Sequence, residues 1–519
     1  MRTLTTLFIA AALLAPCSSA AQDDVRSVSL LGNGPKYGSP VIAEVDGDTS
    51  NGKEIVVASA NGVVSAISAA GDVLWETALP INGCPALSNS NKLLSTPAVG
   101  TLRGDRQPFV VVGYGGIGGR DCGGGVVALQ GATGEIAWDF DLKAFARRRP
   151  IFSVSHAVIS SPALHDFDGD GTLEVVFGSL DRNIYMVTAT GKLRGYYQAA
   201  DTVFSSPAIF PADQLGQAEI IVGTDISRNR QLRPPTPNGG YVYALRGDAF
   251  KQQAAIGFRA TGSSVWRKTF DQVVQSSPTV GELISSNEGL EVVVATGCYF
   301  PEDSTDKRGR YMKVLSVKTG KVLRTAPLAT CTNSEAAIAD VDGDGLNDVV
   351  IPVQTLGQYG GSGQSQVVAY NPERDAFLWI ANPLVNGSNS KELALFSGLV
   401  IADLDTNGSR EVVVTTGGGL AVLAGATGEH LSCDGRNCSD GRSTFNGFSS
   451  LRNGVAVGDL TNDGTLELVA AGPSSEGGLV QVYSGFQSLI SSPPGPLGDF
   501  VPWPLYRHDA KHSGVQREN

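Results

Sequence analysis

The sequence contains few charged residues and few histidines for its length. Charged side chains make up 17% of the 519 residues, and histidine occurs only 5 times. A charged fraction this low argues against a disordered chain or a coiled coil. Neither the GxSxG motif of serine hydrolases nor the HExxH motif of zinc proteases occurs. The sequence therefore carries neither of these hydrolase signatures, and we predict no catalytic residue from it.

Clustered basic residues and long apolar runs are also scarce. The one notable basic run is Arg147 to Arg149, and the formal net charge is −12. Because nothing basic is clustered enough to replace the counterions of a phosphate backbone, we expect no nucleic-acid partner. The apolar run from Leu7 to Leu14 is too short to cross a bilayer, and later runs are interrupted by charges or glycines. We therefore predict no transmembrane segment.

The N-terminus has the pattern of a secretory signal. One early charge, the apolar run and the small residues Ser18, Ala20 and Ala21 predict a signal peptide over residues 1–21, which implies a secreted or periplasmic protein. Cys17 leaves a lipoprotein open as an alternative. Pro16 disfavours it, because a lipobox has a small unbranched residue in that position.

Six cysteines follow the predicted signal peptide, and they form local pairs in the sequence. An oxidising compartment favours disulfides for such an even set, and the absence of a CxxC motif disfavours zinc. We predict three disulfides, which are Cys84–Cys122, Cys298–Cys331 and Cys433–Cys438.

Turn residues and apolar residues are abundant, and they recur in a repeated phrase. The chain has 64 glycines, 26 prolines and 42% hydrophobic residues, which indicates many turns around a real core. The phrase is a small-residue run with an apolar strand, a turn, a second strand, a glycine-rich turn, a third strand and often a fourth. It starts near residues 39, 95, 160, 205, 276, 335, 397 and 453.

This period predicts an all-β, eight-bladed β-propeller over residues 22–490, with four-stranded antiparallel blades. Seven blades stay open as an alternative, because an insertion at 227–238 complicates the count, and an open β-solenoid is disfavoured by the length of the period. The last repeat shows only three strands. We predict that residues 26–32 supply its outer strand and close the ring, and that the Pro/Gly-rich tail at 491–519 packs on the propeller.

An acidic turn in the third repeat is the best candidate for a metal site. Asp166, Asp168 and Asp170 alternate, Gly171 allows a sharp bend, and Glu174 follows in the ninth position where a strand begins. Oxygen ligands crowded in this way repel one another unless a cation such as calcium neutralises them. The closing acid comes three residues earlier than in an EF-hand, so the turn is a different kind of calcium loop.

Four other repeats carry a related turn, whereas the second, fourth and fifth repeats have lost it. The alternative interpretation is that Asp-Gly pairs merely make good turns, but this does not explain an acid in the ninth position. We predict structural calcium at all five turns. The further candidate ligands are Asp340, Asp342, Asp344 and Asp348; Asp403, Asp405, Asn407 and Glu411; Asp459, Thr461, Asp463 and Glu467; and Glu44, Asp46, Asp48 and Glu54, where two extra residues precede the closing acid.

Two motifs resemble known propeller repeats. The turn DFDGDGTLE followed by VVFGS resembles the FG-GAP or VCBS repeat, and ALQGATGEIAW at 128–138 is similar to the tryptophan-docking motif of PQQ-type propellers, with weaker copies at 314–323 and 422–431. The resemblance implies a propeller fold with calcium loops. PQQ enzymes typically carry two adjacent cysteines over the cofactor. No two cysteines are adjacent here, so a PQQ dehydrogenase is disfavoured.

Variable loops are the candidate ligand contacts, at 113–125, 228–238, 298–311 and 354–366, and they include aromatic residues such as Tyr114 that could stack on sugars. Because loops on rigid scaffolds often carry binding, we interpret the protein as a monomeric binding module for a protein or polysaccharide, which these loops or the central channel would engage. The alternative is a calcium-assisted polysaccharide lyase. It would need a Lys, Arg or Tyr base that lies beside a calcium ion and faces a cleft.

Overall fold

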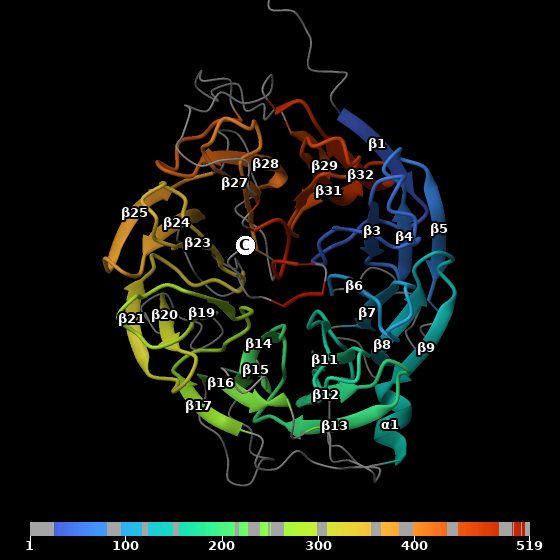
Figure 1. Cartoon of the computed structure of the whole chain (residues 1–519), viewed down its shortest axis with the longest axis horizontal. Coiled ribbons are helices and arrows are strands. Elements are labelled where there is room, and N and C mark those ends of the chain that lie inside the picture. Colours follow the sequence, from blue (N-terminus) through green and yellow to red (C-terminus); the bar gives the residue numbers. More distant parts are fainter. Residues whose placement is uncertain are drawn as a thin grey trace, which may run out of the picture.

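The computed structural model describes residues 25–79, 95–116, 123–148, 155–212, 217–226, 239–247, 250, 264–297, 309–353, 365–383, 398–432, 445–486, 501, 503–509 and 511–513. In these residues the chain forms eight four-stranded antiparallel sheets, which stand as blades around a central axis (Figure 1). One short helix, α1 (Leu142–Arg148), follows blade 2. The prediction of an eight-bladed all-β propeller is confirmed, and the seven-bladed alternative is wrong.

Each blade is a meander whose first strand is innermost. Blade 1 is β2 (Val41–Ala43), β3 (Glu54–Ser59), β4 (Val63–Ile67) and β5 (Val73–Ala78); blade 2 is β6 (Ala98–Gly100), β7 (Phe109–Gly115), β8 (Gly124–Gln130) and β9 (Ile136–Asp141). Blade 3 is β10 (Ala163–His165), β11 (Glu174–Gly178), β12 (Asn183–Val187) and β13 (Leu193–Gln198); blade 4 is β14 (Ala208–Ala212), β15 (Gln217–Ile226), β16 (Gly239–Arg246) and β17 (Ser264–Phe270).

The second half of the ring repeats this order. Blade 5 is β18 (Thr279–Gly281), β19 (Glu291–Ala295), β20 (Tyr311–Ser316) and β21 (Val322–Pro327); blade 6 is β22 (Ala337–Ala339), β23 (Asp348–Val353), β24 (Gln366–Asn371) and β25 (Ala376–Ala381). Blade 7 is β26 (Val400–Ala402), β27 (Glu411–Thr415), β28 (Gly417–Ala424) and β29 (Asn446–Leu451); blade 8 is β30 (Ala456–Gly458), β31 (Glu467–Ser474), β32 (Gly477–Tyr483) and β1 (Val25–Leu30).

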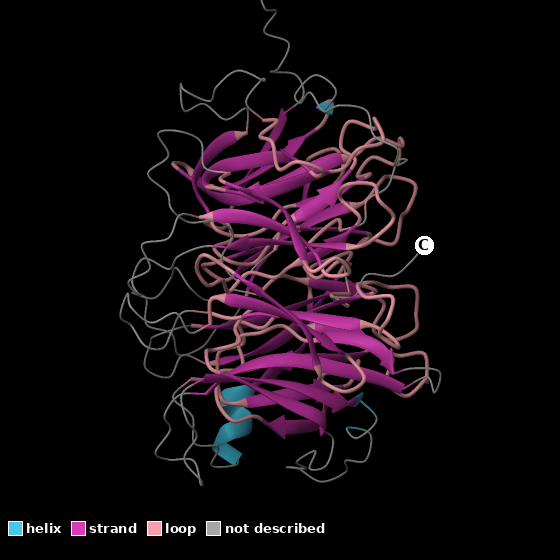
Figure 2. Ribbon diagram, turned by 90° about the vertical axis from the view of Figure 1, so that its left-hand side faces the viewer, coloured by secondary structure: helices cyan, strands magenta, loops and turns pink. Residues whose placement is uncertain are grey.

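The core lies between neighbouring blades. The second strands are continuous runs such as EIVVAS in β3 and EVVFG in β11, and every residue of both is buried. Such unbroken β-branched runs suit strands that are covered on both faces. One apolar cluster, for example, joins Val56 of blade 1 to Val110 of blade 2. The outer strands are partly exposed, as in β5, and Figure 2 shows the strands across the body of the ring with loops at its faces.

A chain of hydroxyl groups joins the inner strands of consecutive blades. The residue two positions before the first strand accepts a hydrogen bond from the backbone N–H of its counterpart in the preceding blade. The bonds are Gly454 N to Ser39 Oγ, Ser39 N to Thr96 Oγ1, Thr96 N to Ser161 Oγ, Ser161 N to Ser206 Oγ and Ser206 N to Ser277 Oγ, at 2.8–3.0 Å. The Ser/Thr-Pro phrase of blades 1 to 5 therefore supplies the hydroxyl groups that link these blades to one another and to blade 8.

Tryptophans lock four blades to their neighbours at the outer rim. Trp75 of β5 donates its indole N–H to the carbonyl of Gly131 in blade 2 at 2.6 Å, and its ring packs on Gly134. Gly134 has a φ of 71°, and a Cβ there would lie 2.5 Å from the ring. The other three pairs are Trp138 with Ala189, Trp266 with Val317 and Trp379 with Gly425. This is the contact that the tryptophan-docking motif predicts.

The N-terminal strand closes the ring. β1 pairs antiparallel with β32 as the outermost strand of blade 8, so the prediction that residues 26–32 close the ring is confirmed. Arg26 of β1 donates a hydrogen bond to the carbonyl of Ala69 in blade 1. This carbonyl lies in the turn that receives a tryptophan in other blades, so an arginine takes the docking role where blade 8 meets blade 1.

The C-terminal segment lies at the centre of the ring (Figure 1). Trp503 forms a β-bridge with Ile401 of blade 7, and Val457 of blade 8 donates its N–H to Pro504. The carbonyls of Lys511 and Ser513 accept hydrogen bonds from the first strands of blades 3 and 4 at 2.9 Å. The described residues of this segment thus bind the inner strands of four blades, at the centre of the ring, where the sequence analysis considered a ligand channel.

Five of the six cysteines in the predicted disulfides lie outside the described residues. They are Cys84, Cys122, Cys298, Cys433 and Cys438. Cys331 is buried and disulfide-bonded. The pairings of the cysteines stay predictions. No helix in the described part of the chain is long and apolar enough to cross a membrane.

Candidate metal turns and an adjoining cleft

The five acidic turns lie on one face of the propeller. Each connects the first strand of its blade to the second, in blades 1, 3, 6, 7 and 8. In a meander the connections from second to third strand lie on the opposite face. The variable loops proposed from the sequence as ligand contacts are of that second kind, and most of their residues lie outside the described part of the chain.

The closing acid of every predicted turn is the first residue of the second strand, and it holds the turn together. One oxygen of Glu174 accepts the backbone N–H of Phe167 at 3.0 Å. The corresponding pairs, at 2.8–3.0 Å, are Glu54 with Val45, Asp348 with Val341, Glu411 with Leu404 and Glu467 with Leu460. Glu291 of blade 5 does the same with Leu283, although the alternating acids are missing there. An acid that opens the second strand is the signal for this contact.

The first and fifth positions order the turn from within. Asp166 accepts backbone N–H groups of Gly169 at 2.7 Å and Gly171 at 2.9 Å. Asp170 accepts the backbone N–H and the hydroxyl of Thr172, and these bonds lower the pKa of its carboxyl group. Blades 6, 7 and 8 repeat this arrangement. The turn is therefore preorganised by its own backbone.

Four of the five turns bring three carboxylates together. In each group the ligand atoms lie within 4.8 Å of one another, and the groups are Glu44, Asp46 and Glu54; Asp166, Asp168 and Glu174; Asp340, Asp342 and Asp344; and Asp403, Asp405 and Glu411. Blade 8 forms no such group among the described residues, because Thr461 replaces an acid. Asp348 stays out of the group in blade 6, since Val341 and Asn371 hold its two oxygens. Asp48 and Asp170 bind residues of their own turns instead.

The turns differ in what balances their charge. In blade 3 the guanidinium of Arg194 pairs with both Asp168 and Glu174. In blade 6, Arg374 pairs with Asp344 at 2.5 Å. No ion pair between the blade 1 turn and a described basic residue is present, and an amide, that of Asn51, contacts Asp46 at 3.0 Å.

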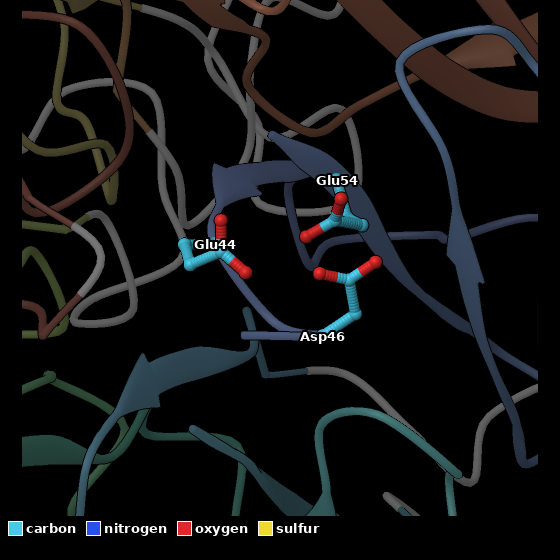
Figure 3. Close-up of side chains that lie close together, drawn as sticks. All are labelled: Glu44, Asp46 and Glu54. Atoms are coloured by element: carbon cyan, nitrogen blue, oxygen red, sulfur yellow. The ribbon is translucent and has the colours of Figure 1, made fainter. Parts of the chain in front are cut away.

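The carboxylate group of blade 1 fits a cation best. Figure 3 shows the carboxylates of Glu44, Asp46 and Glu54 facing one another. The Glu54 side chain is fully buried, and its Oε1 atom has no hydrogen-bond partner in the structure. Burial raises the pKa of Glu54 to about 7. A buried carboxylate oxygen without a donor is costly, and a cation bound there would remove that cost.

A cleft of about 790 Å³ adjoins this turn on the same face, over blade 2. Its walls come from blades 1, 2, 3 and 4 and from the C-terminal segment. Its charged lining consists of three acids and three bases. The acids are Glu44 and Asp166, the first residues of two acidic turns, and Asp509, and the bases are Lys53, Arg106 and Lys511. No ion pair of these three basic side chains with a described residue is present in the structure. No local sequence pattern predicts the cleft, because its basic residues lie far apart along the chain.

Tyr114, one of the aromatic residues that the sequence offered for sugar stacking, has a different role. It is buried, and its hydroxyl donates a hydrogen bond to Asp139 at 2.8 Å. It therefore belongs to the packing of blade 2 and does not form part of a sugar platform.

The fold defines the class of the protein as an eight-bladed β-propeller in which tryptophans dock neighbouring blades. No family model and no curated protein matches the chain. Among solved structures it is similar to BamB from Moraxella catarrhalis, with a TM-score of 0.50, 14% identity, and coverage of 89% of this chain and 96% of that one. The likeness at this identity concerns the fold alone.

Two enzymes have similar folds. The quinohemoprotein alcohol dehydrogenase from Comamonas testosteroni gives a TM-score of 0.57 at 13% identity, over 91% of this chain and 78% of that one. The exotype rhamnogalacturonan lyase YesX gives a TM-score of 0.54 at 14% identity, over 95% of this chain and 80% of that one. The same fold thus occurs in proteins that differ in activity, so function has to be argued from the site.

Proposed function

We propose that the protein is a secreted or periplasmic, calcium-binding β-propeller that binds an acidic polysaccharide in the cleft over blade 2. The observation that carries this proposal is the place of Glu44, which belongs both to the blade 1 carboxylate group and to the cleft wall. A calcium ion held by Glu44, Asp46 and Glu54 would lie at the edge of the ligand site. The signal peptide and the FG-GAP-like turns predicted from the sequence support the location and the metal.

The basic side chains of the cleft are the groups that would bind such a ligand, although three acids, Glu44, Asp166 and Asp509, line it as well. Lys53, Arg106 and Lys511 offer charged donors for carboxylate groups, and Glu44 and Asp166 offer acceptors for hydroxyl groups. The carboxylate of Asp166 already accepts hydrogen bonds from backbone N–H groups of its own turn. It therefore competes little with a ligand for the basic side chains of the cleft. A protein ligand with acidic loops is the second partner class that this surface would accept.

Calcium would act on the cleft through structure. It would neutralise the blade 1 carboxylates and fix the turn that carries Glu44, with an affinity of about 10⁻⁴ to 10⁻³ M, as is usual for extracellular modules. The residues of the turn fit a hard cation, because all of the converging atoms are carboxylate oxygens.

Binding to a panel of acidic and neutral polysaccharides, with calcium and with a chelator, tests the proposal. We expect retention by acidic glycans in calcium, and a weaker interaction for Arg106→Gln and Lys511→Gln. Lys318→Gln is the matched control, because it removes a basic side chain that lies outside the cleft lining. Equal binding by cleft variants and control would contradict a ligand site in the cleft.

An enzyme is the second candidate, and one observation favours it. Basic side chains that make no ion pair with a described residue share the cleft with residues of two acidic turns, which is the arrangement expected for a polysaccharide lyase. In that reaction Lys53 or Lys511, in its neutral form, would take the proton from the carbon next to the carboxylate of a uronic acid unit. A C=C bond would form as the bond from the neighbouring carbon to the glycosidic oxygen breaks, and water would protonate the departing oxygen. Unsaturated sugar products from an acidic polysaccharide would establish the lyase and overturn the pure binding module.

A further inference from the structure

One arginine is directed into an acidic turn from the outer strand of the same blade. Arg194 follows Leu193 in β13, and its two terminal nitrogens contact Asp168 and Glu174. Its side chain is 11% exposed. The guanidinium therefore lies between the two carboxylates that a bound cation would have to bridge.

A β-bulge places Arg194 there. The pairing of β12 with β13 shifts after Val187–Leu193, so that Arg194 is the extra residue and Gly195 pairs with Met186. The same shift occurs in five other blades, where the extra residue is Leu74, Ala137, Val265, Leu323 or Leu378. Among the described bulges of this kind, only the one in blade 3 carries a basic residue.

Blade 1 shows the same turn without an internal cation. Leu74 stands at the position of Arg194, and it is 42% exposed. The buried Glu54, which corresponds to Glu174, keeps an oxygen without a hydrogen-bond partner. Besides the two extra residues of the blade 1 turn, the two turns therefore differ in whether the bulge of the outer strand supplies a positive charge.

We propose that Arg194 is a built-in replacement for calcium, so that the blade 3 turn binds no metal ion while the blade 1 turn binds one. The inference rests on the proposed calcium binding and adds which turns take part. A guanidinium carries one positive charge and several donors in a fixed plane, so it can hold two carboxylates in place without leaving the protein. The turn that best matches the calcium pattern in the sequence would thus be independent of calcium.

The test exchanges the two bulge residues. Calcium binding is measured by isothermal titration calorimetry, with terbium luminescence as a second reading. Arg194→Leu is expected to gain one site relative to the wild type, and Leu74→Arg is expected to lose one. Unchanged stoichiometry in Arg194→Leu, with a circular dichroism spectrum like that of the wild type, would overturn the proposal.

Two further variants keep the test valid if an exchange variant does not fold. Glu54→Gln and Glu174→Gln each remove one charge but keep an oxygen that can accept the N–H of Val45 or Phe167. Glu54→Gln should remove one site or weaken it about tenfold or more, whereas Glu174→Gln should leave calcium binding unchanged. Loss of a site in Glu174→Gln would overturn the role of Arg194. The absence of any calcium binding in the wild type would instead overturn the proposed function.

Discussion

Glu335 of blade 6 and Arg507 of the C-terminal segment form an ion pair in which both side chains are fully buried, with 3.4 Å between Oε2 and Nη1. Glu335 stands two residues before its first strand, where blades 1 to 5 have the serines and threonine that link neighbouring blades. Arg507 also donates to the carbonyl of Pro278 in blade 5 at 2.6 Å. The chain of hydroxyl groups is therefore interrupted at blade 6, where the tail binds instead.

Removal of Arg507 should strongly destabilise the protein. Arg507→Met leaves Glu335 buried without its charged partner, and the loss of one member of a buried pair costs about 3–5 kcal/mol. Chemical denaturation would measure the free energy of unfolding. Lys318→Met is the control, because it breaks an exposed pair with Glu288 and should cost less than about 1 kcal/mol. Equal effects of the two variants would mean that the tail contributes little to the ring.

Two glycines with nearly the same backbone conformation should respond differently to alanine. Gly134 and Gly169 have φ angles of 71° and 73°, but a Cβ on Gly134 would lie 2.5 Å from the Trp75 ring, whereas a Cβ on Gly169 meets no atom within 4 Å. Gly169→Ala should cost only the strain of the left-handed conformation, about 1–2 kcal/mol. Gly134→Ala should cost at least about 1–3 kcal/mol more, because the tryptophan has to move. Thermal and chemical unfolding of both variants checks this difference.

Asp225 should make stability depend on pH. Burial raises its pKa from 3.8 to about 7, and it accepts hydrogen bonds from Gln275 and Thr202, with Asp201 adding repulsion. A raised pKa means that the folded state binds the proton more tightly, so this carboxyl group lowers stability as the pH rises from about 4 to about 7. Asp225→Asn should therefore be more stable than the wild type at pH 8, by up to roughly 4 kcal/mol for a pKa raised from 3.8 to about 7. At pH 4 the difference should be close to zero, and a variant less stable than the wild type at pH 8 would contradict the assignment.

The sequence predicted the features that repeat, and it did not predict those that arise where distant segments meet. The spacing of the small-residue run and its apolar strand predicted eight blades, and the ATGE motif with Trp138 predicted the docking of the blades, because both signals lie within one repeat. The contact of Arg194 with Asp168 crosses 26 residues and depends on a bulge. No local pattern marks it.

The same contrast between local patterns and distant contacts decides which parts of the candidate site could be predicted from the sequence. Each acidic turn is local, so its candidate ligands could be named from spacing alone, but the spacing did not show that Asp48, Asp170 and Asp348 stay outside the carboxylate groups. The cleft joins Lys53, Arg106 and Lys511, which come close only when the ring is closed and the tail has crossed its centre. From the sequence, the loops of the opposite face were predicted as ligand contacts, whereas the described cleft lies on the face of the acidic turns.

Calcium should stabilise the wild type through the blade 1 turn. If the dissociation constant is about 10⁻⁴ to 10⁻³ M, roughly 10 mM calcium would add about 1–3 kcal/mol per site relative to a chelator. Glu54→Gln should lose the contribution of one site, because its amide oxygen offers no negative charge to the ion. Chemical denaturation with calcium, with magnesium and with chelator measures the effect, and magnesium should substitute poorly because it demands a tighter octahedral geometry. A free energy of unfolding that is the same in calcium and in chelator would exclude a structural role for the metal.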